Sequence, residues 1–422
     1  MKTSSFRPTL WKITVVLSVC LCSKSALAIE PLSDITLKQA IKNTLDNNPE
    51  LKEYPFKIRY QKALSRQAEI KPTPQISLEI ENILGTQNYS LGEQSEITLT
   101  LSQNFELGEK LFHRLALSQS KEDSNHLEFE LAKLDIAAET SRRFYEVVYL
   151  QQLSRLINEN LSKQKLLYKK INRLAQEGIA DPVDQSRIKL LLKQSNHHLL
   201  SISKQNDLAK IRLSAMWQSD IDFDNAVGLF DSNFHTPSKA GLLNKIETSP
   251  SQLHYLALQR MADNNLKLEK AKGVQDITFG VGIKHKNSDA AQTINFGMSM
   301  PLAFNNPNQG RIEAAKIKLQ ESRTLQKEST QKLKLKITEY WMSLKNIEAS
   351  LQDIDSQLVP ESEKLLTTSL AAYQRGTTSL LQVMEAQQIL FELRTKQLDL
   401  NKQRQLVLLE IERLVGTQPI AQ

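Results

Sequence analysis

Two long stretches of the sequence contain no glycine, and together they hold a single proline. The first runs from Glu109 to Glu177, and the second runs from Arg311 to Arg375 with Pro360 inside it. Because glycine and proline are the residues that most often end a helix, each stretch predicts one very long helix. At a rise of about 1.5 Å per residue, each helix would be roughly 100 Å long, with a kink or short unwinding at Pro360.

The chain as a whole is poor in turn-forming residues. It has 13 glycines and 13 prolines among 422 residues, about half of the average usage in proteins. A chain with so few turn formers cannot be built from many short elements. The composition therefore argues against β-sandwiches, propellers and α/β barrels.

Apolar residues in the second stretch recur at alternating intervals of four and three residues. This spacing is typical of coiled-coil helices that pack side by side over a long distance. An ordinary amphipathic core helix is the alternative, but the unbroken length favours coiled-coil-like packing. The residues in this pattern are Leu333, Ile337, Tyr340, Leu344, Ile347, Leu351, Ile354 and Leu358.

Four short segments alternate apolar and polar residues with period two, which predicts strands with one apolar and one polar face. They form two hairpins, 75–106 and 276–302, with strands of about 9–11 residues, the length that a tilted strand needs to cross a bilayer. Four strands cannot close a transmembrane barrel, so a membrane role requires several copies of the chain. The alternative is a pair of hairpins packed on the helical core of a soluble protein. The apolar positions are Ile76, Leu78 and Ile80; Ile97, Leu99 and Leu101; Ile277, Phe279, Val281 and Ile283; and Ile294, Phe296, Met298 and Met300.

The first 28 residues have the layout of a secretory signal peptide. Basic residues precede an apolar run over 13–22, and the small residues Ala26 and Ala28 predict cleavage that leaves Ile29 as the first residue. This segment holds four Lys or Arg and no Asp or Glu, so the formal net charge falls from +7 to +3 in the mature chain. A nucleic-acid partner thereby loses its compositional support. Both cysteines leave with the signal, which excludes disulfides and thiolate metal sites from the mature chain.

The two halves of the mature chain repeat the order helix, hairpin, long helix, turn, helix. Gly178 and Gly376, 198 residues apart, each end one long helix, and Asp181-Pro182 and Ser379 predict the caps of the helices that follow. The expected divisions are the signal peptide 1–28, a first repeat 29–217, a polar linker 218–238, a second repeat 239–416 and a tail 417–422.

No chemistry of catalysis is visible in the sequence. There is no phosphate-binding loop and no grouped Ser, His and Asp, and the seven histidines lack metal-ligand spacing. We therefore expect no enzyme activity, no cofactor and no bound metal.

Several motifs, in this order, resemble the TolC-type outer-membrane efflux family, and most of all its CzcC-like cation-efflux branch. The resemblance covers essentially the whole mature chain. The segments that carry it are Pro74-Gln75-Ile76-Ser77-Leu78-Glu79, Gln103-Asn104-Phe105-Glu106-Leu107-Gly108, Pro301-Leu302-Ala303-Phe304, Gln309-Gly310-Arg311, Leu358-Val359-Pro360, Tyr373-Gln374-Arg375-Gly376 and Ser379-Leu380-Leu381-Gln382-Val383-Met384-Glu385.

The resemblance implies a mostly α fold with a small β part. Long coiled-coil-like helices would form a periplasmic α-barrel, and each chain of a homotrimer would give four strands to one transmembrane β-barrel in the outer membrane. It implies a passive conduit for small solutes or metal cations, with outer-membrane lipid, a periplasmic adaptor and a proton-driven inner-membrane pump as partners and no nucleic acid. The alternative from a different class is a soluble periplasmic coiled-coil scaffold or adaptor.

The resemblance also implies two groups of site residues at the helix-to-helix turns. Gln382 and Glu385 would line the channel constriction, although Gln382 departs from the acidic pattern of the family, and Tyr373 would face Asp184. The turns would contact the adaptor through Gly178, Asp181, Pro182, Gly376, Ser379, Leu380 and Leu381.

Overall fold

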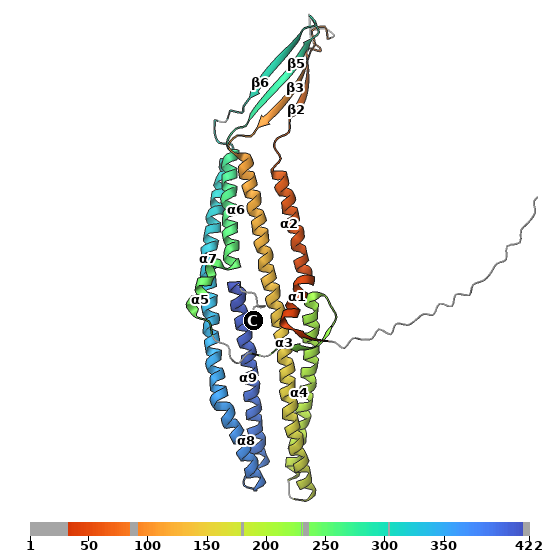
Figure 1. Cartoon of the computed structure of the whole chain (residues 1–422), viewed down its shortest axis with the longest axis vertical. Helices are drawn as coiled ribbons and strands as arrows, with labels where there is room; N and C mark the ends of the chain where they lie inside the picture. Colours follow the sequence, from red (N-terminus) through yellow and green to blue (C-terminus); the bar gives the residue numbers. More distant parts are fainter. Residues whose placement is uncertain are drawn as a thin grey trace, which may run out of the picture.

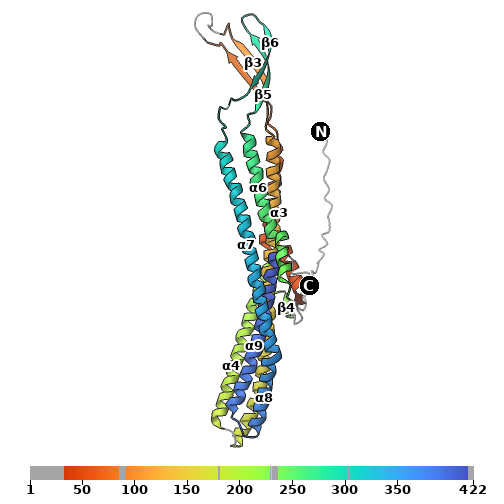
Figure 2. The same ribbon diagram turned by 90° about the vertical axis from the view of Figure 1, so that its left-hand side faces the viewer.

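The computed structural model describes residues 33–84, 92–178, 181–228, 230, 236–302 and 304–416. The molecule is long and narrow, with a small sheet at one end and paired helices running to the other (Figures 1 and 2). The predicted signal peptide, with Ala26, Ala28 and Ile29, and the tail 417–422 lie outside the described residues. No helix in the described ranges is both long and apolar enough to cross a bilayer.

The sheet contains the four predicted strands in the antiparallel order β2-β3-β5-β6. Strands β3 (Glu96–Phe105) and β5 (Ile277–Lys286) have 10 residues each, as expected, and their pairing joins the two hairpins. The expected length is wrong for β2 (Gln75–Glu81) and β6 (Gln292–Ser299), which have 7 and 8 residues. Strand β2 ends where Asn82 takes a left-handed backbone with φ +58°, and β6 ends before Pro301 and leaves Met300 outside the strand.

The alternation in the sequence becomes two different faces of this sheet. One register row places apolar side chains side by side on all four strands: Leu78, Leu99, Ile283 and Ile294. The neighbouring row, which points to the opposite face, is polar: Glu79, Thr98, Lys284 and Thr293. The prediction of one apolar and one polar face is confirmed.

The two long helical stretches are also confirmed. Helix α3 spans Lys110–Gln176 without a break. The second stretch is α7 (Gln309–Asp353), a π-helical turn η4 (Ile354–Leu358) and α8 (Val359–Gln374). Pro360 has no backbone N–H to donate to the carbonyl four residues earlier, and the widened turn directly precedes it.

Most of the predicted coiled-coil positions are buried. Leu333, Ile337 and Leu344 pack against Leu408 and Ile411 of α9. Leu358, the last position of the pattern, is 48% exposed and lies in the π-helical turn, where the regular helical period is lost.

The remaining helices are shorter, and most begin with a recognisable cap. They are α1 (Leu37–Asn47), α2 (Pro49–Ala68), α4 (Pro182–Ser214), α5 (Lys239–Asn244), α6 (Pro250–Lys272) and α9 (Leu380–Val415), with two 3₁₀ turns, η2 (Ala215–Trp217) and η3 (Lys245–Thr248). Asn48 and Ser249 each cap a helix whose first residue is proline, so α2 and α6 begin with the same local structure in the two halves.

A second, two-stranded sheet lies near the middle of the molecule. Strand β1 (Ser33–Thr36) pairs in parallel with β4 (Phe223–Val227), which falls inside the segment 218–238 that we expected to be a polar linker. Phe223 is buried in the largest core cluster with Phe144 of α3 and Trp217. This part of the segment is therefore held in the core.

The helices form a single layer whose order follows the contacts between neighbours. Beside the sheet the order is α7-α6-α3-α2, and towards the opposite end it is α8-α9-α3-α4 (Figure 1). Strand β2 follows α2 along the chain, and both lie at one outer edge of the molecule. Strand β6 precedes α7, and both lie at the other outer edge.

Candidate functional site

Both helix-to-helix turns lie at the end of the molecule opposite the four-stranded sheet, as the repeat predicts (Figure 1). Gly178 and Gly376 have left-handed backbones, with φ of +71° and +73°, and a Cβ at either position would meet no atom within 4 Å. Glycine is therefore required here by the backbone conformation and not by a lack of space. The backbone N–H of Gly376 donates to the Tyr373 carbonyl, and that of Thr377 donates to the Ala372 carbonyl, both at 3.0 Å. These bonds end helix α8.

The two helices that follow these turns begin differently. The Asp181 carboxylate accepts a hydrogen bond from the backbone N–H of Val183 at 2.8 Å, and Pro182 is the first residue of α4. Ser379 occupies the cap position of α9, but its side chain makes no capping hydrogen bond. Asp181 and Ser379 thus both occupy the predicted cap positions, and of the two only Asp181 makes a capping hydrogen bond through its side chain. In the second turn, the neighbouring Thr378 hydroxyl donates to the Gln382 side-chain oxygen.

An apolar cluster directly behind the turns joins the two helical hairpins. Ile171 of α3, Ile188 of α4 and Leu380 and Val383 of α9 are fully buried in it. Leu380 was expected to contact an adaptor, but its burial leaves no surface for a partner. The adjacent Leu381 is 52% exposed.

The constriction candidates lie along the exposed start of α9. Gln382 and Glu385 are both exposed, and their spacing of three residues places them on one side of the helix. Tyr373 is partly buried and packs against the apolar cluster. Burial, together with the nearby Asp184 charge, raises the pKa of the Tyr373 hydroxyl.

No hydrogen bond joins the described side chains of Tyr373 and Asp184, although the Asp184 charge contributes to the raised pKa of Tyr373. Asp184 forms an ion pair with Arg187, whose Nη1 lies 3.8 Å from Asp184 Oδ1. The prediction that Tyr373 faces Asp184 therefore stays a prediction. Gln382 and Glu385 lie on the exposed surface of α9.

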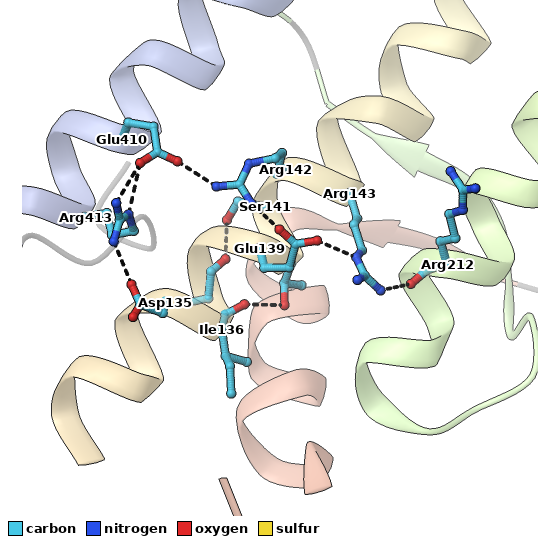
Figure 3. Close-up of polar contacts among 11 residues, drawn as sticks. Asp135, Ile136, Glu139, Ser141, Arg142, Arg143, Arg212, Glu410 and Arg413 are labelled. Carbon is cyan, nitrogen blue, oxygen red and sulfur yellow. Dashed lines mark hydrogen bonds and ion pairs between the residues drawn. The ribbon is translucent and has the colours of Figure 1, made fainter. Parts of the chain in front are cut away.

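Sequence reasoning missed a polar network between α3 and α9, which Figure 3 shows. Arg142 donates to Glu410 Oε1 at 2.6 Å, and Arg413 donates to Glu410 Oε2 at 3.0 Å and to Asp135 Oδ1 at 2.8 Å. Glu139 binds Arg142 and Arg143 on its own helix. No local spacing in the sequence indicates this network, because the partners on α3 and α9 lie far apart in the sequence.

The electrostatics of this network favour the ionised state of Glu410. Burial alone would raise the pKa of the Glu410 carboxyl, but the Arg142 hydrogen bond and the Arg413 charge outweigh burial and lower it. The network also reaches α4, because Arg143 Nη1 donates to the Arg212 carbonyl at 2.8 Å.

The same α3–α9 contact continues towards the turns. The Tyr149 hydroxyl donates to Asp399 at 2.6 Å, and Lys402 lies 2.5 Å from Glu146 and over the Tyr149 ring. Polar contacts therefore join the first and second halves of the chain along much of the helical layer.

No group of three or more His, Cys, Asp or Glu side chains that could hold a metal ion occurs in the part of the chain that the structure describes.

Comparison with known proteins agrees with this architecture. Residues 40–218 match the family model described as outer membrane efflux protein. The cobalt-zinc-cadmium resistance protein CzcC of Cupriavidus metallidurans is 21% identical over 287 residues, which cover 67% of this chain and 68% of that protein.

Solved structures share the fold along most of the chain. CusC, described in a study of folding and transmembrane channel formation, aligns with a TM-score of 0.75 and 17% identity, covering 91% of this chain and 93% of that one. The outer membrane protein VceC of Vibrio cholerae aligns with a TM-score of 0.72 and 17% identity, covering 90% and 96%. These findings confirm the resemblance to the TolC-type outer membrane efflux protein family that the sequence motifs indicated.

Proposed function

We propose that this protein is the outer-membrane channel subunit of a tripartite efflux system. It is a passive conduit that receives small solutes or metal cations from an inner-membrane pump through a periplasmic adaptor. The observation that carries the proposal is the four-stranded sheet, whose apolar face is exposed in one chain. Phe296 is 84% exposed and Ile76 is 74% exposed, which suits contact with lipid and would be costly in water.

In this proposal three chains combine into one barrel. Strands β2 and β6 are the outer strands of the sheet and have no partner on one side among the described residues. Unpaired strand edges cannot stay open within a bilayer, because no water is present there to satisfy their backbone groups. Three copies of four strands would close the ring, with the polar face towards the lumen.

A soluble periplasmic scaffold is less consistent with this sheet. A scaffold would need its strands to cover their apolar face, whereas the described helices leave that face free (Figures 1 and 2). The similarity to CzcC, at 21% identity, favours metal cations among the candidate substrates.

We assign the periplasmic entrance to the turns, with Glu385 as its charged residue. Three symmetry-related Glu385 carboxylates in a narrow opening would attract cations and repel anions. Of the two leucines predicted to contact the adaptor, Leu381 is the exposed one.

Membrane fractionation and single-channel recording test the proposal. The protein should be found in the outer-membrane fraction, have the mass of a trimer in mild detergent, and form cation-selective pores in planar bilayers. Glu385→Gln should reduce the cation selectivity of those pores, and Tyr373→Phe should raise their conductance if Tyr373 and Asp184 hold the entrance closed. A water-soluble monomer that forms no pores would contradict the proposal.

A further inference from the structure

A concave pocket lies in the helical layer, in the half beside the sheet. Helix α6 lines the middle of this pocket, and its neighbours α3 and α7 line the two sides (Figure 1). The pocket has a volume of about 350 Å³, which is within the range of sites that hold small organic molecules. It lies far from the helix-to-helix turns, so it is a different site from the proposed entrance.

The lining of this pocket is mainly apolar. Leu117 of α3 and Ala262 of α6 are buried, with 9% and 7% exposure, whereas Leu325 of α7 is 43% exposed. Leu258 and Met261 of α6 are partly buried between them. Apolar side chains thus line the pocket from its buried base to its exposed rim. An apolar molecule that replaced water there would be stabilised by the hydrophobic effect.

Small side chains leave this space open at the junction of α6 and α7. Ala262 packs against Ala315 and Leu319 of α7. Ser322, one turn further along α7, lines the pocket with only a hydroxymethyl group, and its hydroxyl donates to the Leu319 carbonyl at 2.8 Å. A large side chain at Ser322 would therefore occupy the pocket.

Three charged side chains line the pocket: Lys121, Lys318 and Glu321. Lys318 and Glu321 form an ion pair on α7, with Nζ 2.8 Å from Oε2, so their charges cancel. Lys121 forms no ion pair among the residues that the structure describes. The other lining residues are uncharged, so the pocket has one unpaired positive charge beside an apolar surface.

The acidic neighbours of Lys121 on α3 have other partners. Glu122 pairs with Lys62 of α2 at 3.9 Å, and Asp123 pairs with Arg260 of α6 at 3.6 Å. An unpaired ammonium attracts an anion, and the attraction is stronger where apolar groups reduce the local dielectric constant. The charge of Lys121 therefore favours a negatively charged ligand over a neutral or cationic one.

We infer that this pocket binds a small organic anion, with an apolar body against Leu258, Met261 and Leu325 and a negative group beside Lys121. A body of roughly two or three rings suits the volume of the pocket. Lys121 determines the specificity, because the apolar lining alone does not distinguish an anion from a neutral molecule of the same shape. The inference goes beyond the proposed channel and does not depend on it.

Protection of a single thiol tests whether the pocket is occupied. Both native cysteines lie in the predicted signal peptide, so Leu325→Cys places the one thiol of the mature chain at the pocket. The purified mature protein is kept in lipid nanodiscs, because detergent would compete for an apolar site. Anilinonaphthalene sulfonate, an aromatic anion, should slow the reaction of this thiol with a maleimide about fivefold when its concentration is about four times its Kd.

Ile317→Cys on α7 is the matched control. Ile317 is 62% exposed and lies two residues from both Ala315 and Leu319, which pack against α6, so it points away from the pocket. The reaction rate of this thiol should not change when the probe is added.

A second probe isolates the role of Lys121. Phenylnaphthylamine has the same rings as the sulfonate but no charge. Lys121→Gln, combined with Leu325→Cys, should raise the half-protecting concentration of the sulfonate about threefold to fivefold and leave that of phenylnaphthylamine unchanged. Lys316→Gln, which removes an exposed lysine outside the pocket, should change neither value. Ser322→Phe should abolish protection by both probes.

Several results would overturn the inference. Absence of protection at Leu325→Cys, or equal protection at Ile317→Cys, would show that the probe does not bind in the pocket. A Leu325→Cys thiol that fails to react without any probe would show that the assembled protein covers the pocket. An equal effect of Lys121→Gln on both probes would remove Lys121 as the contact of the anion. Pore formation by the same preparations reports on the proposed channel separately, so either proposal can fail alone.

Discussion

Large apolar side chains are exposed at the sheet end of this molecule and buried at the turn end. At the sheet end, Phe296 and Met298 are 84% and 68% exposed, while at the turn end Ile171, Leu380 and Val383 are fully buried. The turn end completes its core within one chain, since four helices meet there. The sheet end has no such cover in the described structure, and in the proposed channel lipid would cover its apolar face.

The two ends also differ in what holds them together. Backbone hydrogen bonds between strands join the sheet, and these remain satisfied in an apolar environment. At the turn end, side-chain packing joins the helices. The difference indicates that the stability of the sheet end depends on its surroundings, whereas the stability of the turn end does not. Substitutions at each end can test this difference.

The largest effect is expected from a charge on the apolar sheet face. Ile294→Arg would place a cation on the apolar face of the outer strand β6, against lipid in the proposed barrel, at a cost of roughly 2–4 kcal/mol for each chain. Summed over three chains, this should abolish outer-membrane trimers, as measured by fractionation and gel mobility. Asn295→Arg, one residue along on the polar face, is the control and should leave trimers in place. Equal loss in both variants would contradict the assignment of the two faces.

A charge inside the turn-end core should have the next largest effect. Leu380→Asp would bury an unpaired carboxylate and destabilise the turns by on the order of 4 kcal/mol. Proteolysis and hydrogen exchange near Gly178 and Gly376 should rise sharply while the sheet end stays assembled.

Leu381→Asp is the matched control for that substitution. Leu381 is half-exposed, so its change should alter stability by no more than about 0.5 kcal/mol. If the turns contact an adaptor, Leu381→Asp should still reduce export. Normal export in this variant would remove Leu381 from the contact, and equal proteolysis of the two variants would contradict the different burial of Leu380 and Leu381.

A smaller loss of stability is expected from breaking the polar network between α3 and α9. Glu410→Gln would remove the carboxylate that binds Arg142 and Arg413, with a loss of about 2 kcal/mol at neutral pH. The Glu410 pKa is lowered in the fold, so its ionised form adds stability above the unfolded-state pKa of about 4.3 and loses it as the pH falls through the folded-state value.

Thermal unfolding in detergent at several pH values measures the stability that the ionised Glu410 contributes. The difference between wild type and Glu410→Gln should be present at pH 7 and shrink at pH 4 and below. Glu392→Gln, an exposed change on the same helix, should make no difference at either pH. A difference between wild type and Glu410→Gln that does not depend on pH would show that the Glu410 charge is not what matters.

The sequence predicted the local features of both ends well. Strands with period two, glycines that end helices and long stretches without breaks all depend on neighbouring residues, so the pattern alone was sufficient. Strand β2 proved shorter than expected because the left-handed backbone at Asn82 is not visible as a break in the alternation.

Contacts between distant segments could not be predicted in the same way. Leu380 and Leu381 are chemically identical in the sequence, and only the packing of α9 against α3 and α4 decides which one is buried. The partners of Arg142 and Tyr149 lie on α9, in the other half of the chain, so no local spacing indicates them.

The smallest expected effect compares the two turns with each other. Asp181 caps α4 through a hydrogen bond to Val183, whereas the Ser379 side chain makes no capping bond to α9. Asp181→Ala should therefore cost about 1 kcal/mol locally, and Ser379→Ala should cost close to nothing. Hydrogen exchange in the first turn of each helix can resolve this, with faster exchange at Val183 and no change at Gln382. Equal acceleration in both turns would mean that the Ser379 hydroxyl caps its helix in solution, and the two turns would then be stabilised in the same way.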